Sequence, residues 1–530
     1  MALVRGEAGE AAMMWAGPAV LGVCLSALLA CNETTVHVGD GPAGSSAHDD
    51  PVNGESGREP TGEHPDDAPS TLTTTGTTEA TSTSTLSSGG DSTTTDETLG
   101  TSSGAVSSGG DSTTGTSGTT ETSESSGSMS TGTTGSEVQY DAIRVAASEV
   151  SCVLRAGGQV RCWGWPFNGG LGYGMPPPDI IGDDEDPWTA GDVPLGGTVA
   201  QIDGGHTHSC AVLTDGTVRC WGGNNSGCLG YGSTEKVGVL NTPEDVGSVE
   251  LGAPALAVAG GYSTTCALLA TKKVRCWGQG GLLGNQVTEN IGDDEFPSAG
   301  AEVGLSGNAT AIAVGNWHAC AILAGDSVQC WGDGTLGALG YANTEVIGDD
   351  EFPSAVGLVD VGGPVEAIAA GGDFTCALLK SHKVRCWGVE LDGRLGHGDL
   401  KRIGDDEAPS AAAEVDVGGD VTAIALGDSH ACAILAGGNV RCWGDGEYGQ
   451  LGYGNEEDIG DDEHPASAGN VELGGEAVAI AVGIGHTCAV LSTGAVRCWG
   501  RGTTGQLGLG NKANIGDDET PVAVDPVKFL

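Results

Sequence analysis

The chain has 530 residues, of which 38% are hydrophobic and only 4% are aromatic, and it contains 94 glycines. Its 71 acidic residues outnumber its 21 basic residues and give a formal net charge of -50. So acidic a surface repels phosphate backbones, which argues against nucleic-acid binding and favours cations or basic protein surfaces as partners.

The N-terminal segment has the pattern of an export signal. Residues 15–30, WAGPAVLGVCLSALLA, form an apolar stretch that is short for a membrane span and ends in small residues. We therefore expect residues 1–30 to be a signal peptide. The motif LLAC (28–31) resembles a bacterial lipobox, in which the cysteine is lipidated and becomes the mature N-terminus. Cys31 is then a membrane anchor, and the chain is an outer-membrane or cell-surface lipoprotein.

Two features leave an alternative open at this end. The stretch before the apolar run carries Arg5 but also Glu7 and Glu10, and Met13 or Met14 could be the true start. Ordinary secretion would also explain the pattern. Both interpretations predict an extracytoplasmic protein.

Residues 31–136 are predicted to be a disordered linker. The region has almost no large apolar residues and contains runs such as TLTTTGTTEATSTSTL (71–86). It is also acidic, with 16 acidic residues and 1 basic residue in 32–136. Such a composition cannot bury enough apolar surface to offset the entropy lost on ordering.

A repeated cysteine pair dominates the rest of the chain. Two cysteines ten residues apart occur seven times, and Trp-Gly follows each second cysteine at intervals of 54 to 58 residues. This period indicates a repeat architecture. The pairs are Cys152 and Cys162, Cys210 and Cys220, Cys266 and Cys276, Cys320 and Cys330, Cys376 and Cys386, Cys432 and Cys442, and Cys488 and Cys498. Their spacing fits a hairpin better than the short spacing of a zinc site.

The hairpin geometry predicts that each pair can form a disulfide. Opposing Cys210 and Cys220 leaves a three-residue loop, 214–216, which ends in the glycine that such a turn needs. The two cysteines then occupy a non-hydrogen-bonded position with Cα atoms about 4.5 Å apart. That distance is at the short end of the disulfide range. Seven disulfides are expected in an oxidising compartment, and seven pairs of packed thiols are the alternative.

The strand pattern predicts an all-β fold over residues 137–530. The last repeat contains four strand-like pieces, at 471–473, 478–482, 488–491 and 496–499. Seven such units of about 56 residues fit a seven-bladed β-propeller. The last triplet, Val527-Lys528-Phe529, matches the first of the four pieces, so we expect it to complete the first blade and close the ring. An open solenoid is the alternative, but it would expose sheet edges.

Two of the repeats resemble a known family. The segments GGHTHSCAVLTDGTVRCWGGNNSGCLGYG (204–232) and GDSHACAILAGGNVRCWGDGEYGQLGYG (427–454) are similar to repeats of the regulator of chromosome condensation family. The resemblance implies the propeller fold over 140–530. Its eukaryotic namesake is a nuclear exchange factor for a small GTPase, whose exchange-specific insertion has no match here. Secreted bacterial relatives use the same ring to bind another protein, and this chain looks like that cysteine-rich secreted type.

Six repeats carry the acidic string I-G-D-D-E. We expect these strings to gather on one rim, either as turns whose aspartates accept backbone N–H bonds or as calcium ligands. The strings lack the spacing of a dedicated calcium loop, so the turn is the preferred interpretation. The candidate ligands are Asp183, Asp184, Asp293, Asp294, Asp349, Asp350, Asp405, Asp406, Asp461, Asp462, Asp517 and Asp518.

Three further sets of residues recur at fixed places. An arginine precedes Cys-Trp in all repeats but the fourth, which has Gln329, and we expect it to pair with a carboxylate. A histidine lies two residues before the first cysteine in four repeats, where turn stabilisation or packing is preferred over metal binding. Cys228 replaces a glutamine and is expected to be a free thiol, with intermolecular pairing as the alternative. The arginines are Arg161, Arg219, Arg275, Arg385, Arg441 and Arg497, and the histidines are His208, His318, His430 and His486.

The sequence therefore predicts a binding protein. We find no Ser/His/Asp set, P-loop or H-E-x-x-H motif in it, so neither catalysis nor a cofactor is expected. We expect a monomeric, non-catalytic propeller on the cell envelope that binds a protein or cell-surface ligand through its variable connections, such as 165–180 and 223–240. Trp165 and Trp188 are candidate anchors, although core packing would also explain them. A secreted polysaccharide lyase or hydrolase and an exchange factor are the alternatives.

Overall fold

The computed structural model describes residues 140–145, 150–175 and 179–529. Cys31, the predicted signal peptide and the predicted linker lie outside these ranges, so their interpretation stays a prediction. Within the described ranges, the helices are all too short to cross a lipid bilayer.

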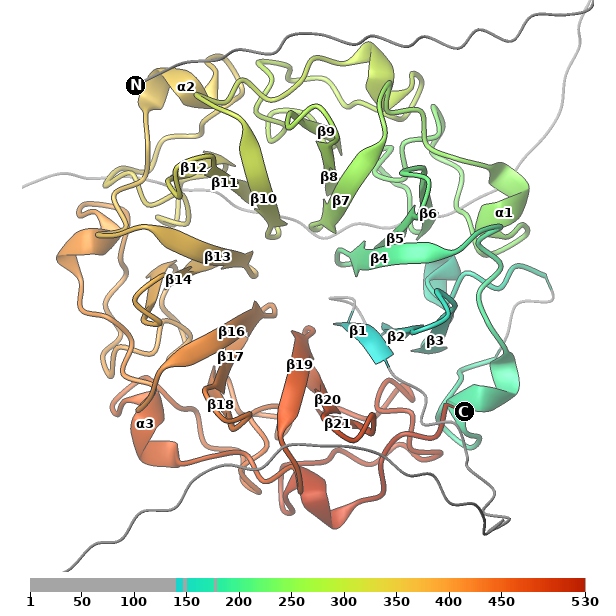
Figure 1. Ribbon diagram of the computed structural model, residues 1–530, viewed down its shortest axis with the longest axis vertical. Helices are drawn as coiled ribbons and strands as arrows, with labels where there is room; N and C mark the ends of the chain where they lie inside the picture. Colours follow the sequence, from blue (N-terminus) through green and yellow to red (C-terminus); the bar gives the residue numbers. More distant parts are fainter. Residues whose placement is uncertain (1–139, 146–149, 176–178, 530) are drawn as a thin grey trace, which may run out of the picture. The chain divides into compact units, whose positions relative to one another are not determined.

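Seven three-stranded antiparallel sheets, or blades, surround a central axis (Figure 1). The strands nearest the axis are β1 (Tyr140–Val145), β4 (Val199–Gly204), β7 (Ala255–Gly260), β10 (Ala309–Val314), β13 (Val365–Ala370), β16 (Val421–Leu426) and β19 (Ala477–Val482). The middle strands are β2 (Val150–Arg155), β5 (His208–Leu213), β8 (Thr264–Leu269), β11 (His318–Leu323), β14 (Phe374–Leu379), β17 (His430–Leu435) and β20 (His486–Leu491). The outer strands are β3 (Val160–Gly164), β6 (Val218–Gly222), β9 (Val274–Gly278), β12 (Val328–Gly332), β15 (Val384–Gly388), β18 (Val440–Gly444) and β21 (Val496–Gly500).

Short helical turns lie outside the outer strands. The α-helices are α1 (Pro243–Val246), α2 (Pro353–Val356) and α3 (Pro465–Ala468). The 3-10 turns are η1 (Phe167–Gly169), η2 (Pro187–Ala190), η3 (Pro297–Ala299), η4 (Pro409–Ala411) and η5 (Pro521–Ala523). All of these except η1 begin at a proline, whose fixed φ suits the first position of a helical turn.

The middle strands are the core of the ring. Every residue of β5 and β17 is buried, whereas the inner strands expose residues such as Ala200 and Thr422. Strands that are covered on both faces carry nearly continuous apolar runs, and the sequences HSCAVL and HACAIL have this character. The predicted seven-bladed propeller is thus confirmed, with each blade covered by its two neighbours.

The prediction of four strands per blade is wrong. Residues 471–473 form no strand; Val471 makes one backbone hydrogen bond to Val440 of β18 at 2.9 Å. The apolar alternation itself is present, because Val471 and Leu473 are buried and Glu472 is exposed. The piece is too short to extend the ladder between its flanking glycines, and it belongs to the preceding blade.

The predicted closure by the C-terminal triplet is wrong for the same reason. Val527 donates its backbone N–H to Val496 of β21, so the triplet joins the last blade. The triplet still reaches the first blade through side chains and carbonyls: the Phe529 ring stacks on Trp163, and its carbonyl accepts from Arg161 at 2.9 Å. The ring is therefore closed by packing between the first and last blades, not by a shared sheet.

All seven cysteine pairs form disulfides in the structure, with their Cα atoms 4.0–4.1 Å apart. The expected turn is present as well: the Leu213 N–H donates to the Thr217 carbonyl at 2.8 Å, and Gly216 has a φ of 83°. This turn sets a register in which the two cysteines of a pair face each other. The bridges join Cys152 to Cys162, Cys210 to Cys220, Cys266 to Cys276, Cys320 to Cys330, Cys376 to Cys386, Cys432 to Cys442 and Cys488 to Cys498.

The Cα separation is shorter than the sequence analysis predicted. The expected value was about 4.5 Å, which is typical of a non-hydrogen-bonded pair. The bridges instead bring the Cα atoms of Cys162, Cys276, Cys330, Cys386 and Cys498 to within 4.0–4.1 Å of those of their partners. A disulfide therefore draws the middle and outer strands of a blade together.

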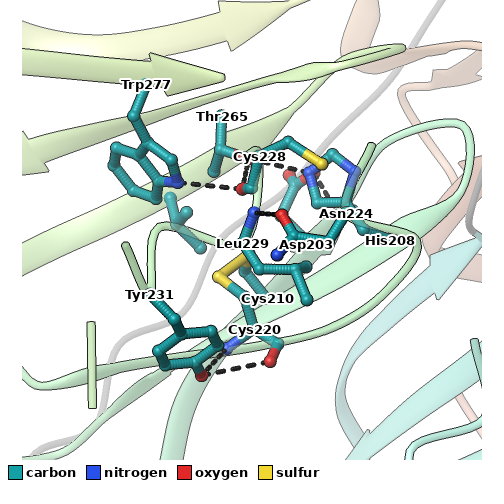
Figure 2. The surroundings of a disulfide bond; sticks show 12 residues. Asp203, His208, Cys210, Cys220, Asn224, Cys228, Leu229, Tyr231, Thr265 and Trp277 are labelled. Atoms are coloured by element: carbon teal, nitrogen blue, oxygen red, sulfur yellow. Dashed lines mark hydrogen bonds between the residues drawn. A yellow bond between two sulfur atoms is a disulfide. The ribbon is translucent and has the colours of Figure 1, made fainter. Parts of the chain in front are cut away.

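One backbone carbonyl in each of several blades receives two donors from the next blade. Figure 2 shows this node between the second and third blades, where the Cys228 carbonyl accepts from Trp277 Nε1 and from the Thr265 hydroxyl, both at 2.8 Å. His208 Nε2 bonds the same hydroxyl at 2.7 Å. The node recurs at Ala338, Gln450 and Gln506, the last of which joins the seventh blade to the first. The seventh and first blades are thus joined by the same hydrogen bonds that join other neighbouring blades.

Glycine makes the close approach between blades possible. Gly516 has a φ of 102°, and a Cβ there would collide with the Gly449 carbonyl in the loop of the preceding blade.

Trp331 is the exception among the seven tryptophans that follow the second cysteine of a pair, because its buried indole N–H has no partner in the described structure. The loop facing it is shorter by two residues, Gly281 following directly on Gly280 where the second blade has Asn225 and Ser226 in between.

Removing one disulfide should cost stability without changing the fold. For Cys432→Ala with Cys442→Ala we expect a loss of about 2–3 kcal/mol, because the bridge closes a short loop. Thermal unfolding by calorimetry measures it. Mass spectrometry with and without reduction tests the pairing itself, and alkylation of all fourteen cysteines without reduction would contradict it.

Breaking one node should destabilise the joint that it holds. In Thr487→Val the shape is kept but His430 loses its partner and Gln450 loses one donor, so we expect a loss of about 1–3 kcal/mol. Thr344→Val is the matched control, since Thr344 is exposed and its hydroxyl has no hydrogen bond among the described residues, and the stability of this variant should change by no more than about 0.5 kcal/mol. Equal melting temperatures for the two variants would show that the node contributes nothing.

Candidate binding face

Loops that join the inner strands to the middle strands meet around the axis at one end of the ring. We call the described six, 205–207, 261–263, 315–317, 371–373, 427–429 and 483–485, the mouth face. Backbone hydrogen bonds link neighbouring loops, for example from His206 to the Gly261 carbonyl at 3.0 Å and from Asp428 to the Gly483 carbonyl at 3.3 Å. Five of the loops and the ends of the inner strands line a small open cavity of about 50 Å³ on the axis.

Glycine explains why the loops can meet. A Cβ at Gly205 would collide with the Gly261 carbonyl, so only glycine fits at the first position of this loop. The residues that follow differ from blade to blade, being His206, Tyr262 and Asn316 in three successive loops. The mouth face therefore combines a shared backbone with side chains that differ from copy to copy.

Three aromatic side chains form a continuous strip on one half of this face. The rings of His206 and Tyr262 lie 4.4 Å apart between centroids, and those of Tyr262 and Trp317 lie 4.8 Å apart at an interplanar angle of 28°. Tyr262 is 37% exposed, and the other two are half-buried. We call these three residues the aromatic strip. It runs over the second, third and fourth blades.

Carboxylates occupy the other half. Asp428 accepts from the Asn316 side chain at 2.6 Å, and the pKa of Asp373 is raised, first by burial and then by the negative charge of Asp428. Asp333 raises the pKa of Asp373 further, whereas the Arg394 guanidinium opposes the shift. We call Asp333, Asp373 and Asp428 the acidic arc; Asp373 and Asp428 belong to mouth-face loops, and Asp333 lies beside the face, directly after β12. The arc lies on the fourth, fifth and sixth blades.

The acidic strings lie elsewhere, on the outside of the ring. Each starts where an isoleucine bridges the end of an outer strand, as Ile515 does with Gly500. In at least five strings the carboxylate oxygens gather within 4.8 Å of one another. Burial, and after it a hydrogen bond to Asp518, raises the pKa of Glu519 to about 7. Backbone capping is seen in part, since the Asp518 N–H donates to the Asp517 side chain at 3.0 Å.

Calcium binding at these strings stays a prediction. Some of the carboxylates already have cationic partners, such as Lys512 with Asp183 at 2.9 Å and Arg402 with Asp405 at 3.6 Å. The remaining predicted ligands are Asp184, Asp293, Asp294, Asp349, Asp350, Asp406, Asp461, Asp462, Asp517 and Asp518.

The recurring arginines bind carbonyls rather than one common carboxylate. Several of them donate a hydrogen bond to the carbonyl of the proline that begins the helical turn on the outer side of the same blade. Gln329 does the same in the fourth blade. The pairs are Arg219–Pro243, Arg275–Pro297, Gln329–Pro353, Arg385–Pro409 and Arg497–Pro521, at 2.7–3.1 Å. The expected carboxylate pairing is present for three of the six arginines: Arg161 pairs with Asp192 at 2.8 Å, and Arg275 and Arg385 lie 3.8 and 3.9 Å from Glu302 and Glu414. The arginines therefore fix the outer wall of the ring.

The four histidines do not come together. Each bonds a hydroxyl of the next blade, as His430 does with Thr487 at 2.8 Å and His486 with Ser151 at 2.9 Å. Burial lowers the pKa of His318 to about 4 and that of His430 and His486 to about 3, so these rings are neutral. Their role is to join blades, which the sequence alone did not show.

The remaining candidates are one thiol and two tryptophans. Cys228 is free and 2% exposed, with Sγ 3.3 Å from the Gly223 carbonyl, and burial raises the pKa of its thiol to about 12. Such a thiol is neutral, and its burial keeps it from pairing with a cysteine of another protein. Trp165 and Trp188 are both exposed rather than packed in the core, and Trp165 stacks on Phe167.

Sequence reasoning missed the aromatic strip and the acidic arc. The available signal was the variable pair of residues just before each middle strand, for instance Asn316-Trp317 in one repeat and Gly372-Asp373 in the next. The longer connections 165–180 and 223–240 differ more between repeats and conceal this signal; of the first, residues 176–178 lie outside the described structure.

A buried glutamate lies in the loop that carries Arg394. Glu390 is 7% exposed; one of its oxygens accepts from the Leu395 N–H at 2.8 Å, and the other has no partner in the described structure. The second blade has Asn224 at this place, whose amide donates to the carbonyls of Ser233 and Glu235. Burial raises the pKa of Glu390 to about 7. A protonated glutamate can donate as the asparagine does.

Glu390→Gln should therefore remove the pH dependence of stability that Glu390 causes. Because the pKa of Glu390 is raised from 4.5 to about 7 by folding, its contribution to stability is present below pH 4.5 and is lost as the pH rises to about 7. Relative to the wild type, the free energy of unfolding of the variant should rise by up to about 3 kcal/mol between pH 5 and pH 8. Melting temperatures across this range measure the gain, and a constant difference would contradict it.

Comparisons with known proteins agree with the repeat pattern. A model of the regulator of chromosome condensation (RCC1) repeat matches residues 199–228, 256–282, 309–338, 365–394, 421–450 and 477–506. A second RCC1 repeat model matches residues 215–268 and 437–490. These segments contain the middle and outer strands of the second to seventh blades, in whole or in part.

Curated relatives share parts of the chain. The ultraviolet-B receptor UVR8 of Arabidopsis thaliana is 34% identical over 204 residues, which are 38% of this chain and 44% of the receptor. The mitochondrial RCC1 domain-containing protein RUG3 of the same plant is 30% identical over 322 residues, covering 59% of this chain and 67% of RUG3. The match thus spans less than half of the length of UVR8.

Solved structures show the same fold. Prp20p of Saccharomyces cerevisiae has a TM-score of 0.54 at 18% identity, over 73% of this chain and 87% of its own. Human WBSCR16 has a TM-score of 0.52 at 19% identity, over 66% and 86%. Together with the repeat matches and the relationship to RUG3, these findings lead to one conclusion: the chain belongs to the regulator of chromosome condensation (RCC1) repeat family.

Proposed function

We propose that this chain is a non-catalytic propeller that binds another protein through its mouth face. The observation that carries the proposal is the contrast between the two kinds of position in the repeat. Residues that join blades recur from copy to copy, whereas the mouth face presents His206, Tyr262 and Trp317 on one side and carboxylates on the other. Exposed aromatic residues gathered beside polar groups are typical of protein-binding surfaces.

Related propellers support protein binding as the general role. One structure of Prp20p was presented with its binding properties to Gsp1p and histones, and another holds Kap60 bound to Prp20. A catalytic role has less support, because the titratable groups with raised pKa at the mouth, such as Asp373, have no nucleophile and base arranged beside them among the described residues. Exchange activity rests on the family resemblance alone.

The proposed setting is outside the cytoplasm. Seven disulfides between buried cysteines require an oxidising compartment in which to form. We propose further that Cys31 carries a lipid anchor and that residues 31–136 tether the propeller to the envelope. The net charge of -50 supports a protein partner rather than nucleic acid.

Crosslinking on intact cells tests the proposed face. A photoreactive residue replacing Tyr262 should crosslink a specific envelope protein, because the side chain is exposed in the centre of the aromatic strip. The same residue replacing Phe296 is the matched control, since Phe296 is also aromatic and is 42% exposed, but lies on the outside of the ring at η3.

A product found at position 262 and absent at 296 supports the mouth face. Crosslinks at 296 alone, or at neither position, would contradict the proposal.

A further inference from the structure

The aromatic strip offers a surface that suits a cation. Its rings are stacked or tilted at centroid distances of 4.4 and 4.8 Å, so Tyr262 in the middle exposes its edge, and a free ring face is available at the Trp317 end. The faces of aromatic rings carry negative electrostatic potential and attract ammonium and guanidinium groups. Apolar contact is available at the same place, so the strip can hold both the stem and the head of a long basic side chain.

The acidic arc adds charge next to the strip. Trp317 and Asp333 come from the same blade, where the Asp333 N–H donates to the Trp317 carbonyl at 2.9 Å. The neighbouring cation, Arg394, is already engaged, because its guanidinium donates to the Leu391 carbonyl at 3.0 Å and lies 3.4 Å from Asp392. The negative charge of the arc is thus only partly compensated within the described residues.

Charge complementarity decides between the candidate occupants. Residues 137–530 contain 53 acidic residues against 19 basic ones, so an acidic partner would be repelled. The chain's own segment 32–136, with 16 acidic residues and 1 basic residue, is repelled for the same reason. A neutral sugar could stack on the rings but would gain little from the carboxylates. A basic polypeptide segment gains from both.

We propose that the mouth face binds a lysine- or arginine-rich segment of a protein partner, with a basic side chain held between the aromatic strip and the acidic arc. This inference rests on the proposed function and adds the chemistry of the partner. The basic head lies over the Trp317 face that Tyr262 does not cover and pairs with Asp373 or Asp428, while the apolar stem contacts the exposed edge of Tyr262. A charge on this head is essential, whereas its hydrogen-bond donors are not.

Defined peptides test the chemistry directly. The probe is a fluorescent 12-residue peptide of alternating lysine and serine, titrated with the full chain at physiological salt and followed by anisotropy. Acetylating every lysine removes the charge and should weaken binding at least about tenfold, whereas trimethylating every lysine keeps the charge and should preserve binding. Equal affinity for the lysine and acetyl-lysine peptides would overturn the proposal.

Matched variants separate the mouth face from the general acidity of the chain. Tyr262→Leu, Trp317→Leu and Asp373→Asn should each weaken binding at least about fivefold. Phe296→Leu and Asp294→Asn, both outside the mouth face, should stay within about twofold of the wild type. Tyr262→Leu changes an exposed side chain and guards against a folding defect in the half-buried Trp317 variant. If Asp294→Asn weakened binding as much as Asp373→Asn, the attraction would be non-specific and the proposal would fail.

The crosslinked partner distinguishes this inference from the proposed function. If position 262 crosslinks a basic segment, both stand. If it crosslinks a neutral or acidic segment, or if a neutral oligosaccharide competes with the peptide as well as free peptide does, the basic-segment proposal falls while binding at the mouth face stands. If position 262 crosslinks nothing, the proposed function itself falls.

Discussion

The ring depends on a single kind of joint, in which a buried tryptophan of one blade donates its indole N–H to a loop carbonyl of the preceding blade. Of the seven tryptophans that follow the second cysteine of a pair, six make this bond at 2.8–3.0 Å. The same carbonyl accepts a serine or threonine hydroxyl in four joints, and that hydroxyl bonds a histidine. Leaving any of these buried groups without a partner costs free energy, so each joint fixes one position of the next blade.

The disulfides and the joints stabilise different parts of the ring. A disulfide holds each hairpin within its own blade, whereas the tryptophan, hydroxyl and histidine act between blades. Neutral histidines suit this task, because a charged ring would be expensive at full burial. Since the joint between the seventh and first blades uses Ser151, His486 and Gln506 in the same way, the ring needs no shared strand to close.

Much of the fold could be predicted from the repeat. The spacing of Cys210 and Cys220 predicted the turn, the register and the pairing, because these follow from local geometry along the chain. The strand count and the closure were wrong, because the partner of Val471 or Val527 depends on which neighbour lies closer in three dimensions. The aromatic strip could not be predicted, since His206, Tyr262 and Trp317 lie about 55 residues apart and meet only when the ring is closed.

If the mouth face binds a partner, it should be covered on intact cells. Hydroxyl-radical footprinting can compare the purified chain with the chain on intact cells, with Tyr262 and Trp317 as reporters and the exposed Phe296 as reference. A partner bound at the mouth face should lower the oxidation of Tyr262 and Trp317 on cells and leave that of Phe296 unchanged. Equal oxidation of all three residues in both settings would contradict binding at the mouth face.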